Sequence, residues 1–275
     1  MDGLERVYRD MPAIEPKPHE CIRVLSYNVH RCLGLDGTLS PSRIAEVIAG
    51  VEPDIVALQE LDVGRLRSGN VDQAQLIADE LKMNVHFHPA MRVLEELYGD
   101  AVLTDRPVRL VKAGALPVRR RSLFSEPRGA IWVSVDCSGT ELQLINTHLA
   151  LDGRERLQQI DMLLGSSWTA HPDCRDPLLL VGDLNAVPIS RSYRRLAASM
   201  RGVPGPPAFP STLPCLRLDH VFCRGDIAVV GCHAVKTRLS RIASDHLPIV
   251  IDIRLPVARA VAPANMSAVG AFPPG

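Results

Sequence analysis

Short apolar runs that stop abruptly at a carboxylate constrain the fold of this chain more than any other feature. The clearest run extends from Leu178 to Val181 and leads into Asp183, and a second run from Asp54 to Gln59 stops at Glu60. Runs of this length and composition are typical of strands that are buried on both faces. The sequence therefore predicts covered β-sheets whose polar groups collect at the strand ends.

Further strands and helices alternate irregularly around these runs. Strands are predicted at 22–27, 85–88, 100–104, 108–113, 130–136, 141–148, 217–223, 227–236 and 248–254. Helices are predicted after the capping residues Ser40, Asn70 and Ser190, and over 153–164, where Arg154, Glu155 and Arg156 are expected on the exposed face. The pattern indicates a mixed α/β or α+β protein rather than a doubly wound sheet.

Opposite charges balance in this sequence, with 31 Lys and Arg residues against 31 Asp and Glu residues. A formal net charge of zero provides no global field that would draw the chain onto nucleic acid or an anionic membrane. Aromatic residues make up only 4% of the chain, which leaves few surfaces for stacking bases. Nucleic acid is therefore a disfavoured partner, although the charge balance does not exclude it.

The length of 275 residues suits one large domain or two small ones. We expect a single domain over 21–255, with an extended lead-in at 1–20 and a disordered tail at 256–275, because no linker or repeat divides the chain. Seven cysteines without a Cys-x-x-Cys pair argue against a disulfide framework and a structural zinc site. The sequence has neither a signal-peptide pattern nor an apolar run long enough to span a bilayer, so a cytoplasmic location is expected. The oligomeric state is not indicated.

Polar groups at the predicted strand ends come from six separate segments. Loops at strand ends are where α/β proteins collect ligand-binding groups. Each segment alone is also explained as an ordinary turn or a capped loop, but the whole set exceeds what turns require. The groups are Asn28, Glu60, Asn146 to His148, Asp183 with Asn185, Asp219, and Asp245 with His246.

These six segments follow one another in a defined order and spacing. They read Ser26-Tyr27-Asn28-Val29-His30, Pro53-Asp54-Ile55-Val56-Ala57-Leu58-Gln59-Glu60, Asn146-Thr147-His148-Leu149, Gly182-Asp183-Leu184-Asn185, Leu218-Asp219 and Ser244-Asp245-His246-Leu247-Pro248. In this order the set resembles the motifs of the endonuclease/exonuclease/phosphatase superfamily, over residues 22 to 254. The resemblance implies a DNase I-like four-layer α/β sandwich, in which two mixed β-sheets pack face to face with helices outside. It also implies metal-dependent hydrolysis of phosphate esters.

The resemblance assigns the metal and the nucleophilic water to one group of residues. Glu60 would be the principal ligand of Mg²⁺, or alternatively Mn²⁺, with Asn28 and Asp245 nearby, in keeping with the oxygen ligands that Mg²⁺ prefers. Asp183 would orient and deprotonate the attacking water, and Asn185 would hold a phosphate oxygen. Whether one or two metal ions bind stays open.

A second group of residues is assigned to the phosphate and the leaving group. His246 would donate to a phosphate oxygen, and Asp219 would fix its tautomer and favour its charged form. His148 would assist the leaving group or hold the phosphate, and which histidine is the general acid stays open. Arg128 is either a phosphate contact or the partner of Glu126 in an ion pair, while His30 is either a substrate contact or a solvated loop residue.

Within the superfamily the motifs favour one branch. Apurinic-site endonucleases carry a tyrosine-containing motif where this chain has Asn146-Thr147-His148-Leu149. The motif of this chain instead resembles the branch that contains DNase I, sphingomyelinases, inositol phosphatases and deadenylases. Asp100 stands where small bacterial members usually carry Asn. A phosphodiesterase is therefore the leading hypothesis, with a phosphodiester or phosphomonoester substrate that the sequence does not identify. The alternatives are a DNA nuclease or apurinic-site endonuclease, and a non-catalytic member that binds a phosphorylated ligand.

Overall fold

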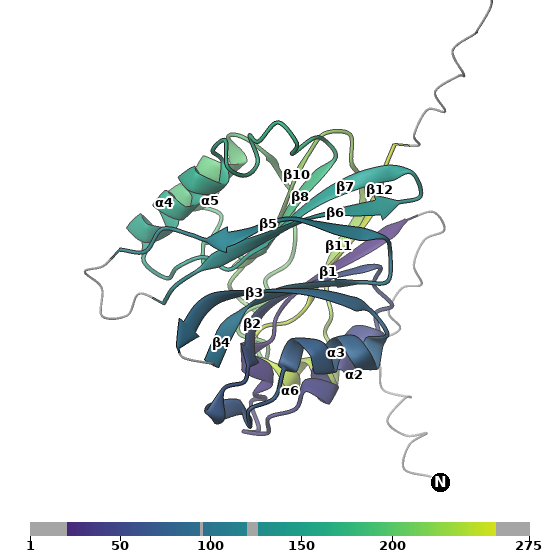
Figure 1. Ribbon diagram of the computed structural model, residues 1–275, viewed down its shortest axis with the longest axis vertical. Helices are drawn as coiled ribbons and strands as arrows, with labels where there is room; N and C mark the ends of the chain where they lie inside the picture. The colour runs from purple at the N-terminus through teal and green to yellow at the C-terminus, as the bar shows by residue number, and fades with distance from the viewer. Residues whose placement is uncertain (1–20, 94–95, 120–125, 257–275) are drawn as a thin grey trace, which may run out of the picture.

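Two six-stranded β-sheets form the centre of the protein in the computed structural model, which describes residues 21–93, 96–119 and 126–256 (Figure 1). The first sheet contains β1 (Ile22–Asn28), β2 (Ile55–Val63), β3 (Asn84–Val93), β4 (Glu96–Thr104), β11 (Ala228–Ala234) and β12 (Ile249–Arg254). The second contains β5 (Val108–Ala115), β6 (Gly129–Cys137), β7 (Thr140–Thr147), β8 (Leu178–Asp183), β9 (Arg201–Gly202) and β10 (Asp219–Arg224). The predicted lead-in and nearly all of the predicted tail lie outside the described residues.

Helices cover the outer face of each sheet. α2 (Pro41–Ala49), α3 (Gln73–Leu81) and α6 (Arg238–Ala243) lie against the first sheet, and α4 (Gly153–Leu163) and α5 (Arg191–Ala197) lie against the second (Figure 1). Two short 3₁₀ helices, η1 (His30–Cys32) and η2 (Leu66–Ser68), follow β1 and β2. None of the helices in the described part of the chain combines the length and hydropathy that crossing a membrane requires.

Three apolar layers hold these elements together, as a four-layer sandwich requires. The middle layer joins the inner faces of the two sheets and includes Val24, Val133 and Val181. The outer layers bury the helices, with Ile44 of α2 packed against the first sheet and Ile160 of α4 against the second. The predicted DNase I-like architecture, with two mixed sheets inside and helices outside, is confirmed.

Each sheet has a single parallel strand pair, and that pair lies at its centre. The strand orders are β11-β12-β1-β2-β4-β3 and β5-β6-β7-β8-β10-β9, and only the pairs β1–β2 and β7–β8 are parallel among the described strands. Parallel neighbours need a crossover connection, which α2 and α4 supply. In both pairs the two carboxyl ends therefore point to the same edge of the sheet, where α/β proteins place their ligand sites.

One buried amide joins the two sheets by hydrogen bonds. Asn146 on β7 donates through Nδ2 to the carbonyl oxygens of Leu58 and Ala101, both at 2.9 Å, and its Oδ1 accepts from Nε2 of Gln59 at 2.8 Å. These three partners belong to β2 and β4 of the first sheet. Asn146 is fully buried, so it acts as a structural link between the sheets.

The cap of α3 and the exposed face of α4 differ from the prediction. The N-cap of α3 is Asp72, whose side chain accepts from the Gln75 amide, because Asn70 lies in a left-handed turn with φ of 57°. Glu155 on α4 is buried rather than exposed, since its carboxylate accepts from the backbone amide of Arg119 at 3.4 Å. The first difference comes from the irregular backbone at Asn70, and the second from a contact with the distant residue Arg119. Helical periodicity predicts neither.

Two other predicted helix caps are confirmed, and two short elements have no counterpart in the sequence prediction. Ser40 caps α2 by accepting from the Arg43 amide, and Ser190 caps α5 by accepting from the Tyr193 amide, both as predicted. β9 and α6 were not predicted because each is too short to show periodicity. All seven cysteines are free thiols.

Replacement of the inter-sheet amide tests this account of the sandwich. Asn146→Ala removes three buried hydrogen bonds, including those to two backbone carbonyls, so it should lower the free energy of unfolding by about 3 kcal/mol. Chemical denaturation measures this loss. The matched control is Asn84→Ala, an exposed site on β3, where a change within about 0.5 kcal/mol is expected. Equal effects at the two positions would contradict the structural role of Asn146.

Candidate active site

The predicted site residues gather where the carboxyl ends of the two parallel pairs face each other. Asn28 is the last residue of β1, and Asp183 is the last residue of β8. His148 directly follows β7, whereas Glu60 lies within β2. The packing of the sheets thus brings side chains from four strands, two in each sheet, to one edge of the sandwich.

Glu60 occupies a β-bulge, so the prediction that its strand stops there is wrong. β2 continues to Val63, and its register against β4 shifts between Leu58 and Leu61. Glu60 itself has φ of 63°, a left-handed conformation that few non-glycine residues adopt. Its backbone amide donates to the buried side-chain carboxyl of Asp100 on the neighbouring strand β4. Bulges re-aim side chains next to active sites, and this one accompanies the placement of the Glu60 carboxylate beside Asn28.

The Asn28 amide connects two of the carboxylates. Its Nδ2 donates to Oε1 of Glu60 at 3.0 Å and to Oδ2 of Asp183 at 3.1 Å. Its Oδ1 accepts from the backbone amide of His30 at 3.0 Å. Asn28 is buried, and the Ser244 hydroxyl donates to its backbone carbonyl at 2.8 Å. The orientation of Asn28 is therefore fixed from both sides.

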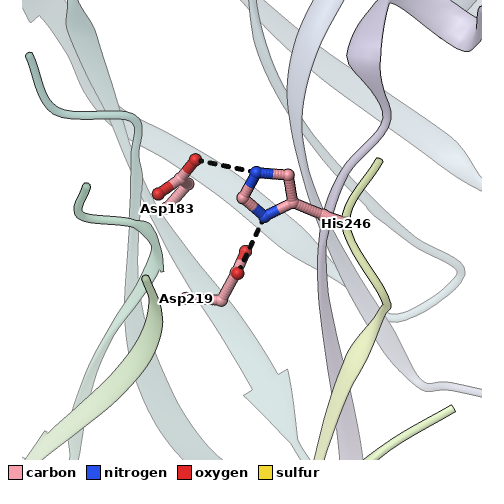
Figure 2. Close-up of side chains that lie close together, drawn as sticks. All are labelled: Asp183, Asp219 and His246. Atoms are coloured by element: carbon pink, nitrogen blue, oxygen red, sulfur yellow. Dashed lines mark hydrogen bonds and ion pairs between the residues drawn. The ribbon is translucent and has the colours of Figure 1, made fainter. Parts of the chain in front are cut away.

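His246 lies between two carboxylates (Figure 2). Its Nδ1 is 2.9 Å from Oδ2 of Asp219, and its Nε2 is 3.6 Å from Oδ2 of Asp183. Burial lowers the pKa of His246, but the charge and hydrogen bond of Asp219, together with Asp183 and Asp245, outweigh burial and raise the pKa to about 10. A pKa of about 10 keeps His246 in its cationic form at neutral pH.

His148 lies between two hydrogen-bond donors. Nη1 of Arg128 donates to its Nδ1 at 3.1 Å, and Nδ2 of Asn185 lies 3.0 Å from its Nε2. Burial, followed by the charges of Arg128 and His246, lowers the pKa of His148 well below its ordinary value. A neutral imidazole accepts at one nitrogen only. If Nδ1 accepts from Arg128, Nε2 carries the proton, and Asn185 then has an amide hydrogen available for another acceptor.

Asp183 is held by groups on both of its oxygens. Oδ1 accepts from the backbone amide of Asn185 at 2.9 Å, and Oδ2 accepts from Asn28 while facing Nε2 of His148 at 3.6 Å. Burial raises the pKa of Asp183, and the positive charge of His246 acts in the opposite direction. The carboxylate therefore has a fixed orientation and a raised proton affinity.

The donor set at this edge fits a hard divalent cation. Burial raises the pKa of Glu60, and the negative charges of Asp183 and Asp245 raise it further, while the hydrogen bond from Asn28 lowers it. Burial also raises the pKa of Asp100 to about 7. Several carboxylates thus repel one another in a region of low dielectric, which a bound cation would relieve. Glu60 and Asp245 offer carboxylate oxygens of the kind that Mg²⁺ prefers. Asn28 turns its Nδ2 toward Glu60 and Asp183, so the oxygen it could offer a metal is Oδ1, which accepts from the His30 amide.

A second arrangement for a metal ion involves the acid–base groups. One ligand atom each from Asp183, Asp219 and His246 lies within 4.8 Å of the others. Nδ1 of His246 is committed to Asp219, which leaves Nε2 as the nitrogen that could face an ion. The family motifs predict proton transfer and phosphate contact for these three residues, and those roles stay predictions.

The remaining predicted residues lie around this centre in different ways. Arg128 contacts His148 and also pairs with Glu126 at 3.1 Å, so the ion pair expected as an alternative is present. His30 is partly exposed, and its Nδ1 lies 4.0 Å from Oδ1 of Asp245. Both residues are placed at the site, but their roles toward a substrate stay predictions.

Sequence reasoning missed Phe209 as part of the site. Its ring packs on the imidazole of His246, with the two centroids 4.8 Å apart. The Ser211 amide donates to the carbonyl oxygen of Asp245 at 2.7 Å, which attaches the loop of Phe209 to the loop of His246. The short segment Phe209-Pro210-Ser211 has no feature that predicts a role at the site from the sequence alone.

His220 faces away from the site because successive residues of a strand point to opposite faces. Its Nε2 is 2.6 Å from the carbonyl oxygen of Ala186, and its ring packs against Tyr193 and Phe222. Burial lowers the pKa of His220 to about 4, partly offset by the hydrogen bond to Ala186. Its neighbour Asp219 instead lies 2.9 Å from Nδ1 of His246 at the candidate site, so adjacent residues of β10 lie in different environments.

A four-layer sandwich with an acidic centre at the facing edges of two sheets defines the class of this protein. The family model described as the endonuclease/exonuclease/phosphatase family matches residues 25–246. The chain therefore belongs to the endonuclease/exonuclease/phosphatase family, as the motifs predicted. As its name states, this family groups nucleases with phosphatases, which hydrolyse phosphate esters. Comparison with curated proteins gave no significant match.

Solved structures show the same fold. An endonuclease/exonuclease/phosphatase from Beutenbergia cavernae is 24% identical, with a TM-score of 0.70 over 86% of this chain and 72% of that chain. The catalytic domain of human nocturnin with a bound sulfate anion is 23% identical, with a TM-score of 0.65 over 87% of this chain and 98% of that one. A mannosyl-6-phosphatase from Bacteroides thetaiotaomicron is 18% identical, with a TM-score of 0.68 over 85% and 100% of the two chains.

Removal of the Asp219 charge should lower the pKa of His246. Asp219→Asn eliminates the charge and weakens the hydrogen bond that raise this pKa, while burial continues to lower it. We expect a fall of about 1–3 units, measured by NMR titration of the imidazole. Asp226→Asn, an exposed change in the loop after β10, is the control and should leave the titration of His246 unchanged. An unaltered pKa in Asp219→Asn would refute the assigned pair.

His220 should make the stability of the fold sensitive to acid. Its pKa is about 4 in the folded protein and about 6.5 when unfolded, so the unfolded chain binds the proton more readily. The contribution of neutral His220 is complete above pH 6.5 and is lost as the pH falls from about 6.5 through about 4. His220→Gln keeps an amide donor for Ala186. Between pH 7 and pH 4 the unfolding free energy of the native protein should fall by about 3 kcal/mol more than that of the variant, as measured by denaturation at each pH.

Proposed function

We propose that this chain is a divalent-metal-dependent hydrolase of phosphate esters, and specifically a phosphodiesterase. The observation that carries the proposal is the position of Asp183. One of its oxygens accepts from Asn28, which also donates to Glu60, and the same oxygen lies 3.6 Å from the imidazolium of His246. Glu60 as a metal ligand, Asp183 as a proton acceptor and His246 as a cationic donor would therefore act close together.

Glu60, Asn28 and Asp245 would hold Mg²⁺, or Mn²⁺ in its place. The ion would withdraw charge from a phosphoryl oxygen as the phosphorus is attacked. Glu60 reaches this position because of the bulge in β2, and Asn28 because it ends β1. The negative charges of Asp183 and Asp245 near Glu60 favour cation binding.

Asp183 would orient the attacking water and accept its proton. Its orientation is fixed by the Asn185 amide on Oδ1 and by Asn28 on Oδ2. Burial raises its proton affinity, which suits a general base that has to accept a proton near neutral pH. Nε2 of His148 and Nε2 of His246 each lie 3.6 Å from Oδ2 of Asp183, so the base would lie beside the donors proposed for the phosphate.

The phosphate oxygens would be held by donors from both sheets. His246 stays protonated because of Asp219 and would donate through Nε2. With a proton on its Nε2, His148 cannot accept from Asn185. Asn185 would therefore donate this amide hydrogen to a phosphate oxygen. Arg128 would keep His148 neutral and in one tautomer by donating to Nδ1. His148 could then donate from Nε2 to a phosphate or leaving-group oxygen, while His30 lies at the edge of the site for substrate contact.

Substitution of Asp183 tests the assigned base. Asp183→Asn preserves the shape of the side chain and removes its ability to accept a proton, so it should reduce hydrolysis of bis(p-nitrophenyl) phosphate by about 10²-fold or more. Asp226→Asn should retain full activity. Comparable turnover by Asp183→Asn and the native protein would exclude Asp183 as the base.

The same assay tests the metal and the substrate class. EDTA should abolish turnover, and Mg²⁺ or Mn²⁺ in excess should restore it. A parallel assay with p-nitrophenyl phosphate distinguishes a diester from a monoester preference, which matters because one structural relative is a mannosyl-6-phosphatase. Turnover that persists in EDTA would contradict the metal requirement, and faster monoester hydrolysis would contradict the phosphodiesterase assignment.

A further inference from the structure

Phe209 is a partly exposed aromatic residue that the three apolar layers do not explain. Within the described residues it belongs to none of these layers, although the flanking Ala208 and Leu247 belong to the middle one. Its ring packs instead on the imidazole of His246, with the two centroids 4.8 Å apart and the ring planes inclined by 45°. The partner of this ring is therefore a residue of the candidate site rather than the core.

Backbone hydrogen bonds hold the two rings against each other. The Leu247 amide donates to the carbonyl oxygen of Ala208 at 2.9 Å, and the Ser211 amide donates to that of Asp245 at 2.7 Å. The chain on either side of Phe209 is thereby bonded to the chain on either side of the histidine. Side chains that oppose each other on paired backbones interact directly, so the ring contact is fixed by the backbone.

The segment that carries Phe209 also leads to Asp219. Phe209 and Leu216 form an antiparallel bridge, in which the Leu216 amide donates to the carbonyl oxygen of Phe209 at 2.8 Å. Asp219 begins β10 three residues later. Arg241 of α6 supports this hairpin by donating from Nη1 to the carbonyl oxygen of Ser211 at 3.1 Å. One short hairpin thus connects the carboxylate at the edge of the imidazole with the ring that covers its face.

The imidazole of His246 needs a defined plane for the role proposed for it. Its Nδ1 is 2.9 Å from Oδ2 of Asp219, and its Nε2 is 3.6 Å from Oδ2 of Asp183 (Figure 2). A hydrogen bond at Nδ1 holds one edge of the ring but does not set its tilt. The χ2 torsion of histidine has only a broad preference of its own, so the tilt has to come from the surroundings of the ring.

We propose that Phe209 is a positioning residue that holds the plane of the His246 imidazole, so that Nε2 points toward a phosphate oxygen. This rests on the proposed function, because it concerns the same site. A smaller side chain at position 209 would leave a gap beside the imidazole and allow it to tilt. Misplacement of a reacting group by about 1 Å can cost about 10²-fold in rate, so the effect is expected in kcat.

Three variants separate positioning from packing. Phe209→Leu removes the flat ring, and Phe209→Tyr keeps it. Phe87→Leu is the matched control, because Phe87 is also partly exposed but packs in the outer apolar layer of the first sheet. We would measure kcat and KM for bis(p-nitrophenyl) phosphate at saturating Mg²⁺, on variants shown to be folded by circular dichroism.

We expect Phe209→Leu to lower kcat by about ten- to a hundredfold with little change in KM. Phe209→Tyr should restore most of the native kcat, and Phe87→Leu should retain full activity. A rise in KM with unchanged kcat would show that Phe209 contacts the substrate instead, and would overturn the proposal. Equal kcat in Phe209→Leu and Phe87→Leu would also overturn it, as would a Phe209→Tyr variant no more active than Phe209→Leu.

Nuclear magnetic resonance of the native protein provides a test that needs neither turnover nor a folded variant. The ring protons of Phe209 should give nuclear Overhauser effects to the C–H protons of the His246 imidazole, and these imidazole signals should shift in Phe209→Leu. Absence of the effects in the native protein would overturn the proposal even if Phe209→Leu did not fold. Absence of metal-dependent turnover by the native protein would instead overturn the proposed function, with the ring contact still decided by the nuclear Overhauser effects.

Discussion

The contact between the inner faces of the two sheets, with the Asn146 amide inside it, is the constraint on which the rest of the structure depends. Asn146 bonds the second sheet to two strands of the first across an otherwise apolar layer. Each sheet alone brings only part of the polar set to its edge. Asn28 and Glu60 come from one parallel pair, and Asp183 comes from the other. The packing of the sheets therefore creates the site as well as the core.

The electrostatics of the site follow from this assembly. A chain of zero net charge concentrates carboxylates at one edge, where burial raises the pKa of both Glu60 and Asp183. Burial lowers the pKa of His246, but Asp219, together with Asp183 and Asp245, raises this pKa and keeps the imidazole positively charged. The balanced composition thus hides a strongly uneven distribution of charge, which a neutral total does not reveal.

At β8 the sequence predicted the polar residue at the strand end correctly, because an apolar run and the polar residue after it are local features. It could not predict the bulge at Glu60, since a bulge is defined by register against β4. It also could not predict that Asn146 links the sheets, because its partner Gln59 is 87 residues away in the chain. Glu155 was assigned to the exposed face for the same reason, as a distant loop covers it.

The order of strands along the chain has a consequence for how the site forms during synthesis. β5 to β10 make the whole second sheet without interruption, whereas the first sheet needs β11 and β12 to return beside β1, with Ile253 opposite Ile22. Asp245 and His246 immediately precede β12. A chain emerging from the ribosome therefore releases Asn28, Glu60 and Asp183 long before Asp245 and His246. The set of side chains at the site is complete only after this last segment has been synthesised.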